Sequence, residues 1–215
     1  MKTYFISGLG ADQRAFQKII LPAGYEPVFI DWIPPQENES LPGYAKRLSS
    51  LITPQDDFVI IGLSFGGMIA SEIARIKNPR KTIIISSLAS SDELPWYFKR
   101  AGKLGLHKAI PVGFLKTASI LNRIVGAGTA EDKAVIYHYI KNADPAFIRW
   151  SLNAIVSWNQ QERLPGIVQL HGGNDHLLPV KFTRPDYTID KGGHLMILNR
   201  ADEVNKILHQ VLSTN

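Results

Sequence analysis

The chain has 215 residues, of which 45% are hydrophobic and 20% are charged, a balance that fits one soluble globular domain with a sizeable core. It contains no cysteine, which excludes a disulfide framework and a thiol nucleophile and fits a reducing compartment. No apolar run approaches the roughly 20 residues that cross a bilayer, and the amino-terminal residues lack the apolar core and cleavage site of a signal peptide. These features predict a cytoplasmic protein without a transmembrane segment.

The net charge of +5 is unevenly distributed. Nine Lys or Arg residues but three acidic residues lie between positions 94 and 150, so the basic excess falls in one middle segment. We interpret this segment as the solvated face of helices, and the alternative is a patch that attracts anionic substrates or surfaces. No nucleic-acid-binding motif accompanies the charge, so we expect no nucleic-acid partner.

Short apolar runs alternate with helical patterns along the chain. Runs rich in β-branched residues predict strands, and apolar residues spaced three or four positions apart predict helices. The predicted strands are 3–6, 27–31, 58–63, 81–86, 166–171 and 187–190, and the predicted helices are 12–20, 42–52, 65–77 and 201–212. This alternation predicts an α/β fold, in which a mostly parallel sheet carries helices on both faces.

Residues 92–162 interrupt the alternation, because this block has helical periodicity and no clear strand. We predict a core of residues 1–91 and 163–215, with 92–162 as a helical lid over the carboxyl edge of the sheet, where open α/β sheets place their sites. The stretch 104–125 mixes apolar and cationic residues, which would permit membrane contact, but packing on the sheet is the favoured interpretation. The aromatic residues of the block are expected mostly to pack, with a few lining an apolar pocket: Trp96, Tyr97, Phe98, Phe114, Tyr137, Tyr139, Phe147, Trp150 and Trp158.

The most informative motif is Gly62-Leu63-Ser64-Phe65-Gly66, at the junction of predicted strand 58–63 and predicted helix 65–77. A serine held there lies on a sharp turn, and close approach of the two elements requires glycine on either side. The turn exposes the hydroxyl above the sheet and directs the first N–H groups of the helix toward the group that it attacks. This arrangement is typical of nucleophilic acyl chemistry at Ser64. The alternative is a glycine-rich turn whose serine only caps the helix.

A serine hydroxyl needs an adjacent base, and histidine is the natural one near neutral pH. His194 is the strongest candidate, because Gly192 and Gly193 before it permit a loop that returns the ring over the sheet edge. The other histidines are expected at a strand end (His171), in the pocket lining as a weaker candidate (His176), in the block 92–162 (His107 and His138) and on the surface of the last helix (His209).

Asp175 is the strongest acid candidate, in the sequence His171-Gly172-Gly173-Asn174-Asp175 directly after predicted strand 166–171. A carboxylate there can reach a histidine on the neighbouring loop, hold its tautomer and stabilise the imidazolium. The alternatives are a turn aspartate that binds its own backbone, or Asp92 as the acid. Asp12 and Arg14 are expected to cap a helix or to pair with each other.

The chain order Ser64, Asp175, His194 is that of α/β-hydrolases, and with Ser7-Gly8-Leu9-Gly10 and Gly193-His194 the sequence resembles this superfamily over nearly all of its length. The resemblance implies the α/β-hydrolase fold and an oxyanion hole made by the backbone N–H groups of Leu9 and Phe65. Ser7 departs from the histidine that the family often has there. The first strand starts near residue 3, which leaves no room for a preceding hairpin, so we expect about six strands and a compact lid.

The resemblance further implies a small, esterase-like serine hydrolase that cleaves a carboxylic ester or thioester through an acyl-enzyme on Ser64. Its partner would be a small ester or acyl compound, with no metal or organic cofactor, and the basic block would favour an anionic substrate. The same residues also permit C–C bond hydrolysis, acyl transfer or lyase chemistry. A ligand sensor with slow turnover is the alternative from outside the enzymes, whereas an aspartate nucleophile is excluded because Ser64 occupies the turn.

Overall fold

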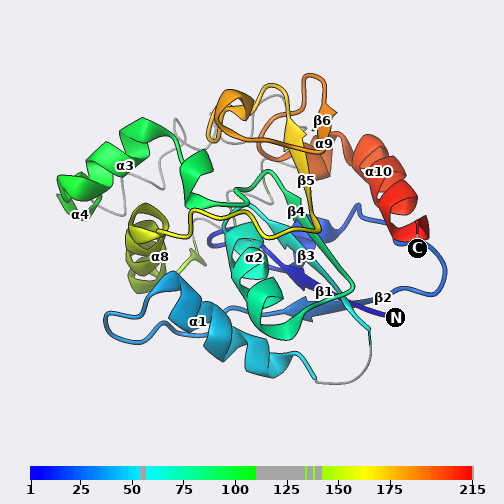
Figure 1. The fold of residues 1–215 in the computed structure, drawn as a ribbon, viewed down its shortest axis with the longest axis horizontal. Coiled ribbons are helices and arrows are strands. Elements are labelled where there is room, and N and C mark those ends of the chain that lie inside the picture. Colours follow the sequence, from blue (N-terminus) through cyan, green and yellow to red (C-terminus); the bar gives the residue numbers. More distant parts are fainter. Residues whose placement is uncertain (54–56, 110–133, 135–137, 139–141, 215) are drawn as a thin grey trace.

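The computed structural model describes residues 1–53, 57–109, 134, 138 and 142–214. Its centre is a six-stranded sheet in the order β2-β1-β3-β4-β5-β6, and every neighbouring pair of strands is parallel (Figure 1). The predicted α/β class and the number of strands are therefore confirmed. The strands are β1 (Lys2–Ile6), β2 (Glu26–Ile30), β3 (Val59–Leu63), β4 (Lys81–Ile85), β5 (Ile167–Gly172) and β6 (Tyr187–Ile189).

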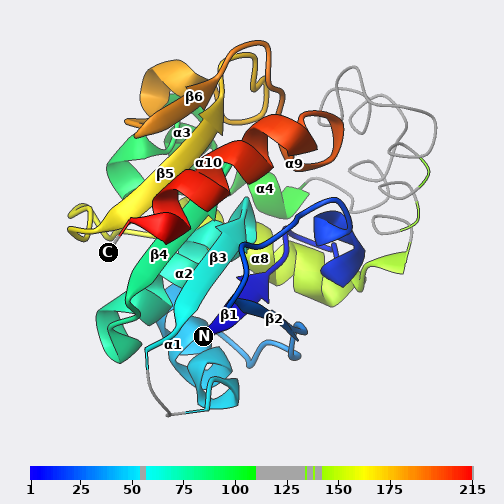
Figure 2. The same ribbon diagram turned by 90° about the vertical axis from the view of Figure 1, so that its right-hand side faces the viewer.

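Both faces of the sheet are buried under helices, which explains why the strands are apolar throughout. Alternate side chains of β1 enter different cores: Tyr4 and Ile6 pack toward α1 and α2, whereas Phe5 packs toward the opposite helices. Figure 2 shows α10 on the near side of the sheet and α2 behind it. These helices are α1 (Leu41–Leu48), α2 (Phe65–Lys77), α9 (Met196–Asn199) and α10 (Ala201–Ser213).

One predicted helix is wrong. Residues 12–20 form a single 3-10 turn over Gln13–Phe16, which Asp12 caps by accepting from the Arg14 N–H, and the two side chains also form the expected ion pair. The following backbone does not continue as a helix because Asn205 of α10 binds it instead. The Asn205 Oδ1 accepts from Ile20 N at 3.0 Å, and its Nδ2 donates to Lys18 O at 2.9 Å. The predicted helix 42–52 is divided between α1 and a 3-10 turn over Ser49–Leu51.

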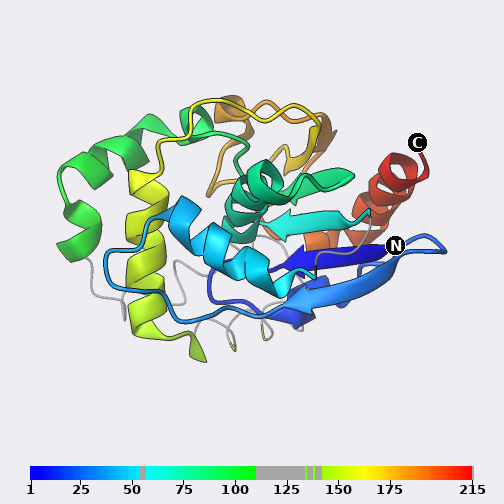
Figure 3. The ribbon, with the colours of Figure 1, turned by 60° about the horizontal axis from the view of Figure 1, so that its bottom comes forward.

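Within the block 92–162, the described segments are helical and lie beyond the ends toward which the strands point (Figure 3). They are α3 (Trp96–Lys103), α4 (Leu106–Ala109) and α8 (Pro145–Ser157). Gly102 lets α3 pack closely on α8, because a Cβ at this position would lie 2.6 Å from the Cβ of Val156. Phe114, Tyr137, Tyr139 and most of the stretch 104–125 lie outside the described residues. Among the described helices, none has the length and hydrophobicity of a membrane span.

Helix α8 is fastened to the sheet domain by tryptophan side chains. The Trp150 Nε1 donates to the backbone oxygen of Glu39 at 2.8 Å, and the Trp158 Nε1 donates to Glu72 Oε1 of α2 at 2.7 Å. The Trp150 ring also meets the Phe65 ring edge-on, with 5.8 Å between centroids. Because buried indole N–H groups need partners, these contacts fix how α8 sits above the first residue of α2.

The topology places two loops side by side in the middle of the sheet. The chain runs from β1 outward to β2 and then returns to β3 on the other side of β1, so the direction of winding reverses between β1 and β3. Ile6 pairs with Gly62 at the carboxyl ends of these strands. Open α/β sheets bind ligands at such a switch point, and here the loops that open there begin at Ser7 and Ser64.

Candidate active site

Ser64 occupies the strained turn between β3 and α2. Its backbone has φ +52° and ψ −121°, a conformation that a residue with a Cβ rarely adopts and that costs about 1–3 kcal/mol. Three hydrogen bonds hold it there: Ser64 N donates to Ile85 O at 2.9 Å, and Ser64 O accepts from Gly67 N at 2.9 Å and from Ser87 Oγ at 2.6 Å. The surrounding packing therefore maintains the strain and presents the hydroxyl outward.

The glycines on either side of this turn are required by contact with backbone. A Cβ on Gly62 would lie 2.5 Å from the Cα of Gly67, and a Cβ on Gly66 would collide with the carbonyl oxygens of Ile6 and Ser7. The start of α2 thus lies directly on the end of β1. This close approach brings the loop after β1 next to Ser64.

The side chains of Ser64, His194 and Asp175 form one chain of hydrogen bonds. His194 Nδ1 lies 2.8 Å from Asp175 Oδ2, and His194 Nε2 lies 2.9 Å from Ser64 Oγ. A carboxylate can only accept, so Nδ1 carries the proton and Nε2 presents its lone pair to the serine hydroxyl. The imidazole is therefore in the tautomer that can remove the proton of Ser64.

Asp175 is buried and held by several donors. Its Oδ1 accepts from the backbone N–H groups of Leu177 at 2.9 Å and Leu178 at 2.8 Å, which leaves Oδ2 for His194. Burial alone raises the pKa of Asp175, but the electrostatic interaction with His194 and the hydrogen bonds from His171, His194 and Leu178 outweigh it and hold the pKa well below its usual value. The carboxylate is therefore ionised throughout the neutral range.

His171 lies at the end of β5, as expected, but it also contacts the acid. Its Nε2 donates to Leu178 O at 2.7 Å and lies 3.4 Å from Asp175 Oδ2. The ring is fully buried, and its Nδ1 has no partner among the described residues. His171 thereby secures both the carboxylate and the backbone turn that supplies the Leu178 N–H.

The loop after β1 is closed by side chains that meet at one carbonyl. The Ser7 Oγ donates to Ala11 O at 2.6 Å, and the Trp32 Nε1 donates to the same oxygen at 3.1 Å. A Cβ at Gly8 would lie 3.5 Å from the Cβ of Ser64, which shows how near the loop runs. Among the described residues, the N–H groups of Leu9 and Phe65 find no acceptor, and both residues border the cavity above Ser64.

A cavity of about 320 Å³ opens directly on Ser64 and His194. Apart from these two residues, every described side chain that lines it is apolar. Of the nine aromatic residues in the block 92–162, Phe98 is the one that borders the cavity among those described, whereas Phe147, Trp150 and Trp158 pack in the core. The site therefore combines the hydrogen-bonded side chains of Ser64, His194 and Asp175 with an apolar cavity, which is called the chamber below.

Comparison with known proteins identifies the family of this chain. The model of the alpha/beta hydrolase family matches residues 4–207. The chain belongs to the alpha/beta hydrolase family. Membership confirms the predicted superfamily and the prediction of an enzyme of the hydrolase class. Among the curated proteins compared, none matches the sequence.

Solved structures of this α/β-hydrolase fold cover nearly the whole chain. The hydrolase olei00960 from Oleispira antarctica has a TM-score of 0.77 at 15% identity and covers 100% of this chain and 91% of its own. The esterase EaEST from Exiguobacterium antarcticum has a TM-score of 0.75 at 16% identity, with 97% and 90% covered. A bromoperoxidase from Bacillus anthracis has a TM-score of 0.69 at 15% identity, with 98% and 91% covered. At such identities these likenesses show the fold.

The other residues that the sequence offered as site candidates do not join the hydrogen-bonded chain of Ser64, His194 and Asp175 in this α/β-hydrolase. Asp92, the alternative acid, is exposed and lies 3.8 Å from Lys99 Nζ. His176 is exposed and does not border the cavity. The remaining histidines have local partners: His107 with Asn153, His138 with Asn142, and His209 with the backbone oxygen of Ile20. Among the described residues, no three His, Asp or Glu side chains gather as a metal-binding group.

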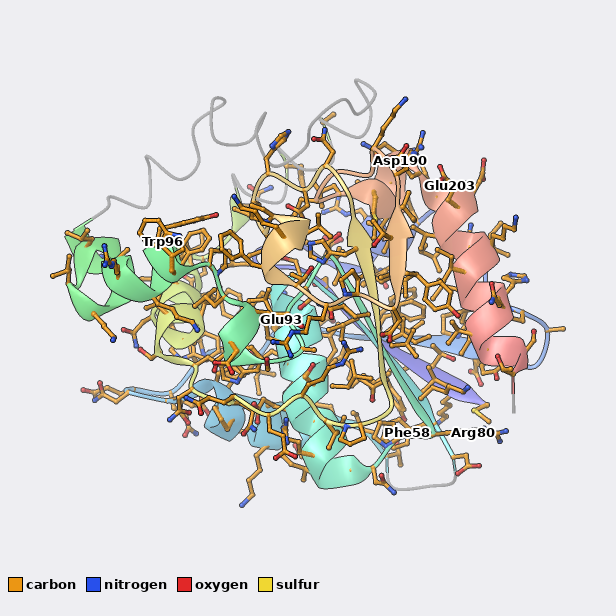
Figure 4. All side chains as sticks on the ribbon, turned by 45° about the horizontal axis from the view of Figure 1, so that its top comes forward. Phe58, Arg80, Glu93, Trp96, Asp190 and Glu203 are labelled. Atoms are coloured by element: carbon orange, nitrogen blue, oxygen red, sulfur yellow. The ribbon has the colours of Figure 1, made fainter. Side chains whose placement is uncertain are left out.

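Sequence reasoning missed the residues that support the central three. Ser87 holds the Ser64 carbonyl, and Gln169 of β5 in turn donates to Ser87 O at 2.9 Å and to the buried carboxylate of Glu93 at 2.9 Å. Glu93 is 3% exposed, whereas Trp96 of α3 is 58% exposed (both are labelled in Figure 4). The spacing of His171 and Asp175 was a usable signal, because the loop after β5 turns the chain back on the strand end. The network of Ser87 has no such signal, since its members come from three separate segments.

Proposed function

We propose that this protein is a serine hydrolase that cleaves a carboxylic ester or thioester through an acyl-enzyme. The proposal rests on one observation: the Ser64 hydroxyl, the His194 imidazole and the Asp175 carboxylate are linked by hydrogen bonds of 2.9 and 2.8 Å. In this proposal Ser64 is the nucleophile, His194 the general base and acid, and Asp175 the group that orients and stabilises the imidazolium. Family membership supports the hydrolase class, and the chemistry at Ser64 is the proposed refinement.

The proposed reaction has two halves. Ser64 Oγ attacks the carbonyl carbon while His194 Nε2 takes the hydroxyl proton, and the oxyanion accepts from the N–H groups of Leu9 and Phe65. The tetrahedral intermediate collapses, His194 gives the proton to the departing alcohol or thiol, and the acyl group remains on Ser64. Water then attacks the acyl carbon while His194 Nε2 takes one of its protons. The bond between Ser64 Oγ and the acyl carbon breaks, His194 returns the proton to Ser64 Oγ, and the acid is released. His194 carries no added proton at the start or at the end of either half.

We also propose that residues 92–162 act as a lid on a core of 1–91 and 163–215. The support is the position of α3 and α8, which supply Phe98, Ile148 and Leu152 to the cavity wall above Ser64. The identity of the acyl group would then depend on this segment, while the bond-breaking groups come from the loops of the sheet.

The test is covalent labelling of the intact protein with a fluorophosphonate, read by mass, beside Ser64→Ala. Ser50→Ala is the matched control, because this serine is exposed on the far turn after α1. We expect one adduct on the parent and the control and none on Ser64→Ala, with hydrolysis of ester and thioester probes lost in parallel. A folded parent that takes no adduct and hydrolyses neither probe would contradict the proposal and favour the ligand sensor. An adduct without hydrolysis would favour acyl transfer or lyase chemistry.

A further inference from the structure

In the part of the chain that the structure describes, the side chains that line the cavity above Ser64 are apolar except for the reacting groups. The polar groups of this lining are the side chains of Ser64 and His194 and the N–H groups of Leu9 and Phe65. The buried carboxylate of Asp175 is already engaged by His194, Leu177 and Leu178, and His171 also contacts it. A polar substituent on a bound acyl group would therefore lose its water without gaining a partner, which costs about 1–3 kcal/mol for a hydroxyl and far more for a charge.

The cavity lining draws residues from both helical layers. Helix α8 supplies Ile148, Leu152 and Ile155, and Leu195 and Leu198 come from α9 and the residue before it. The position of α8 is fixed by hydrogen bonds, because Trp150 donates to Glu39 and Trp158, the residue after the helix, donates to Glu72. The chamber is thus preformed, which reduces the entropic cost of ordering around a flexible chain.

The positive charge of the block 92–162 does not enter the chamber in the part of the chain that the structure describes. The Lys99 Nζ lies 3.8 Å from Asp92, and the Arg100 guanidinium lies 5.3 Å from the centre of the exposed Trp96 ring. Neither Lys99, Arg100 nor Lys103 borders the cavity. The basic residues of the block whose side chains the structure describes therefore give no support to the expectation of an anionic substrate.

We infer that the chamber binds an uncharged, unsubstituted aliphatic acyl group of medium length. This inference rests on the proposed acyl chemistry at Ser64. At roughly 30 Å³ for each water- or methylene-sized group, a volume of about 320 Å³ holds on the order of ten such groups, which corresponds to an acyl chain of about six to eight carbons together with its ester group. Each methylene that enters the chamber adds about 0.8 kcal/mol of transfer free energy.

The first experiment compares kcat/KM for esters of one alcohol with unbranched acyl chains of two to twelve carbons. We expect kcat/KM to rise roughly three- to fourfold for each methylene, to peak near six to eight carbons and then to fall. A probe of equal length with a terminal carboxylate is expected to be at least about 100-fold slower than the unsubstituted six-carbon ester. A profile that is flat or falls from two carbons, or a preference for the carboxylate probe, would overturn the inference.

Two variants of the α8 wall test whether the chamber sets this length. Leu152→Phe places a ring in the cavity and is expected to lower the ratio of the eight-carbon to the two-carbon rate about tenfold. Leu152→Ala removes bulk and is expected to move the peak to longer chains. Leu104→Phe is the matched control, because Leu104 is 73% exposed and does not border the cavity. An unchanged ratio in both Leu152 variants would overturn the inference.

The failure of this inference can be told apart from the failure of the proposed function. Fluorophosphonate labelling and hydrolysis of the two-carbon ester report the activated serine and are measured on every variant, together with the thermal midpoint. If both are intact and chain length has no effect, the chamber does not bind the acyl group. If neither is detected in the folded parent, the proposed chemistry at Ser64 is what has failed.

Discussion

Two regions meet at Ser64, and they hold their side chains in different ways. The loops after β3, β5 and β6 fix Ser64, Asp175 and His194 by hydrogen bonds of 2.8–2.9 Å to one another and to backbone groups. Helix α8, in contrast, presents only hydrocarbon to the cavity. Directional bonds fail when one atom is moved, whereas an apolar wall tolerates changes of similar volume. The chemistry should therefore be sensitive to small substitutions, and selectivity should vary smoothly with cavity volume.

The largest effect is expected for Asp175→Asn. The amide cannot act as a carboxylate toward His194, so the imidazolium loses its counter-charge and the tautomer is no longer fixed. We expect kcat for ester hydrolysis to fall about 10³- to 10⁴-fold with little change in KM. Asp92→Asn is the control, since Asp92 is exposed and pairs with Lys99, and a comparable loss in that variant would refute the assignment of the acid.

Two glycine substitutions, one beside Ser64 and one between α3 and α8, test the two regions separately. A Cβ at Gly66 meets the backbone of Ile6 and Ser7, which cannot move without disturbing β1, whereas a Cβ at Gly102 meets the side chain of Val156 on α8. We expect Gly66→Ala to cost about 3 kcal/mol of stability and to abolish labelling of Ser64. Gly102→Ala should also cost stability, about 1–3 kcal/mol, because the Cβ of Val156 is fixed to its backbone and α3 must move away from α8. Labelling of Ser64 should survive in this variant, because the contact lies between two helices of the block 92–162. Denaturant unfolding and fluorophosphonate labelling measure both variants, and loss of labelling in both would remove the contrast.

His171 tests how far the hydrogen-bonded region extends behind the three central residues. His171→Leu leaves the Leu178 carbonyl without its buried donor and removes a contact that lowers the pKa of Asp175. We expect kcat to fall about tenfold at unchanged KM, with partial recovery in His171→Gln, whose amide can donate to the same oxygen. A positioning role predicts this recovery, and a loss of activity that tracks the thermal midpoint in both variants would indicate a purely structural role.

The lowered pKa of Asp175 also predicts a pH dependence of stability. A carboxylate whose pKa is lower in the folded state stabilises that state fully above its unfolded pKa of about 3.9, and the contribution is lost as the pH falls through the folded pKa. The difference in free energy of unfolding between the parent and Asp175→Asn should therefore shrink as the pH is lowered below about 4. Urea unfolding along a pH series measures it, and a difference that grows toward acid would contradict the assigned direction.

The smallest effect is expected on the outer side of the lid. Replacing Lys99, Arg100 and Lys103 together by glutamine should change the ratio of kcat/KM for anionic and neutral esters by less than about twofold, because none of the three borders the cavity. A selective loss of activity on the anionic ester would show that the basic block guides substrate after all. The result also shows whether substrate selectivity depends on the charge of the lid surface or on the volume of the chamber.

The local sequence determined the elements and the position of the candidate site. Apolar β-branched runs specified the six strands to within two residues at each end, and helix α2 begins and ends as its periodicity predicted. Ser64, Asp175 and His194 each follow a strand. Because the carboxyl ends of parallel strands lie on one edge of a sheet, their order in the chain was enough to bring them together.

Tertiary structure decided what depends on contacts between distant segments. The helix expected over 12–20 failed because Asn205, far along the chain, binds the backbone after Phe16. The contact of His171 with Asp175, the support of Ser64 by Ser87 and the apolar chamber under α8 likewise arise from packing of separate elements. Periodicity and glycine placement act within a few residues, whereas the direction in which a side chain points across a cavity depends on the elements that pack around it.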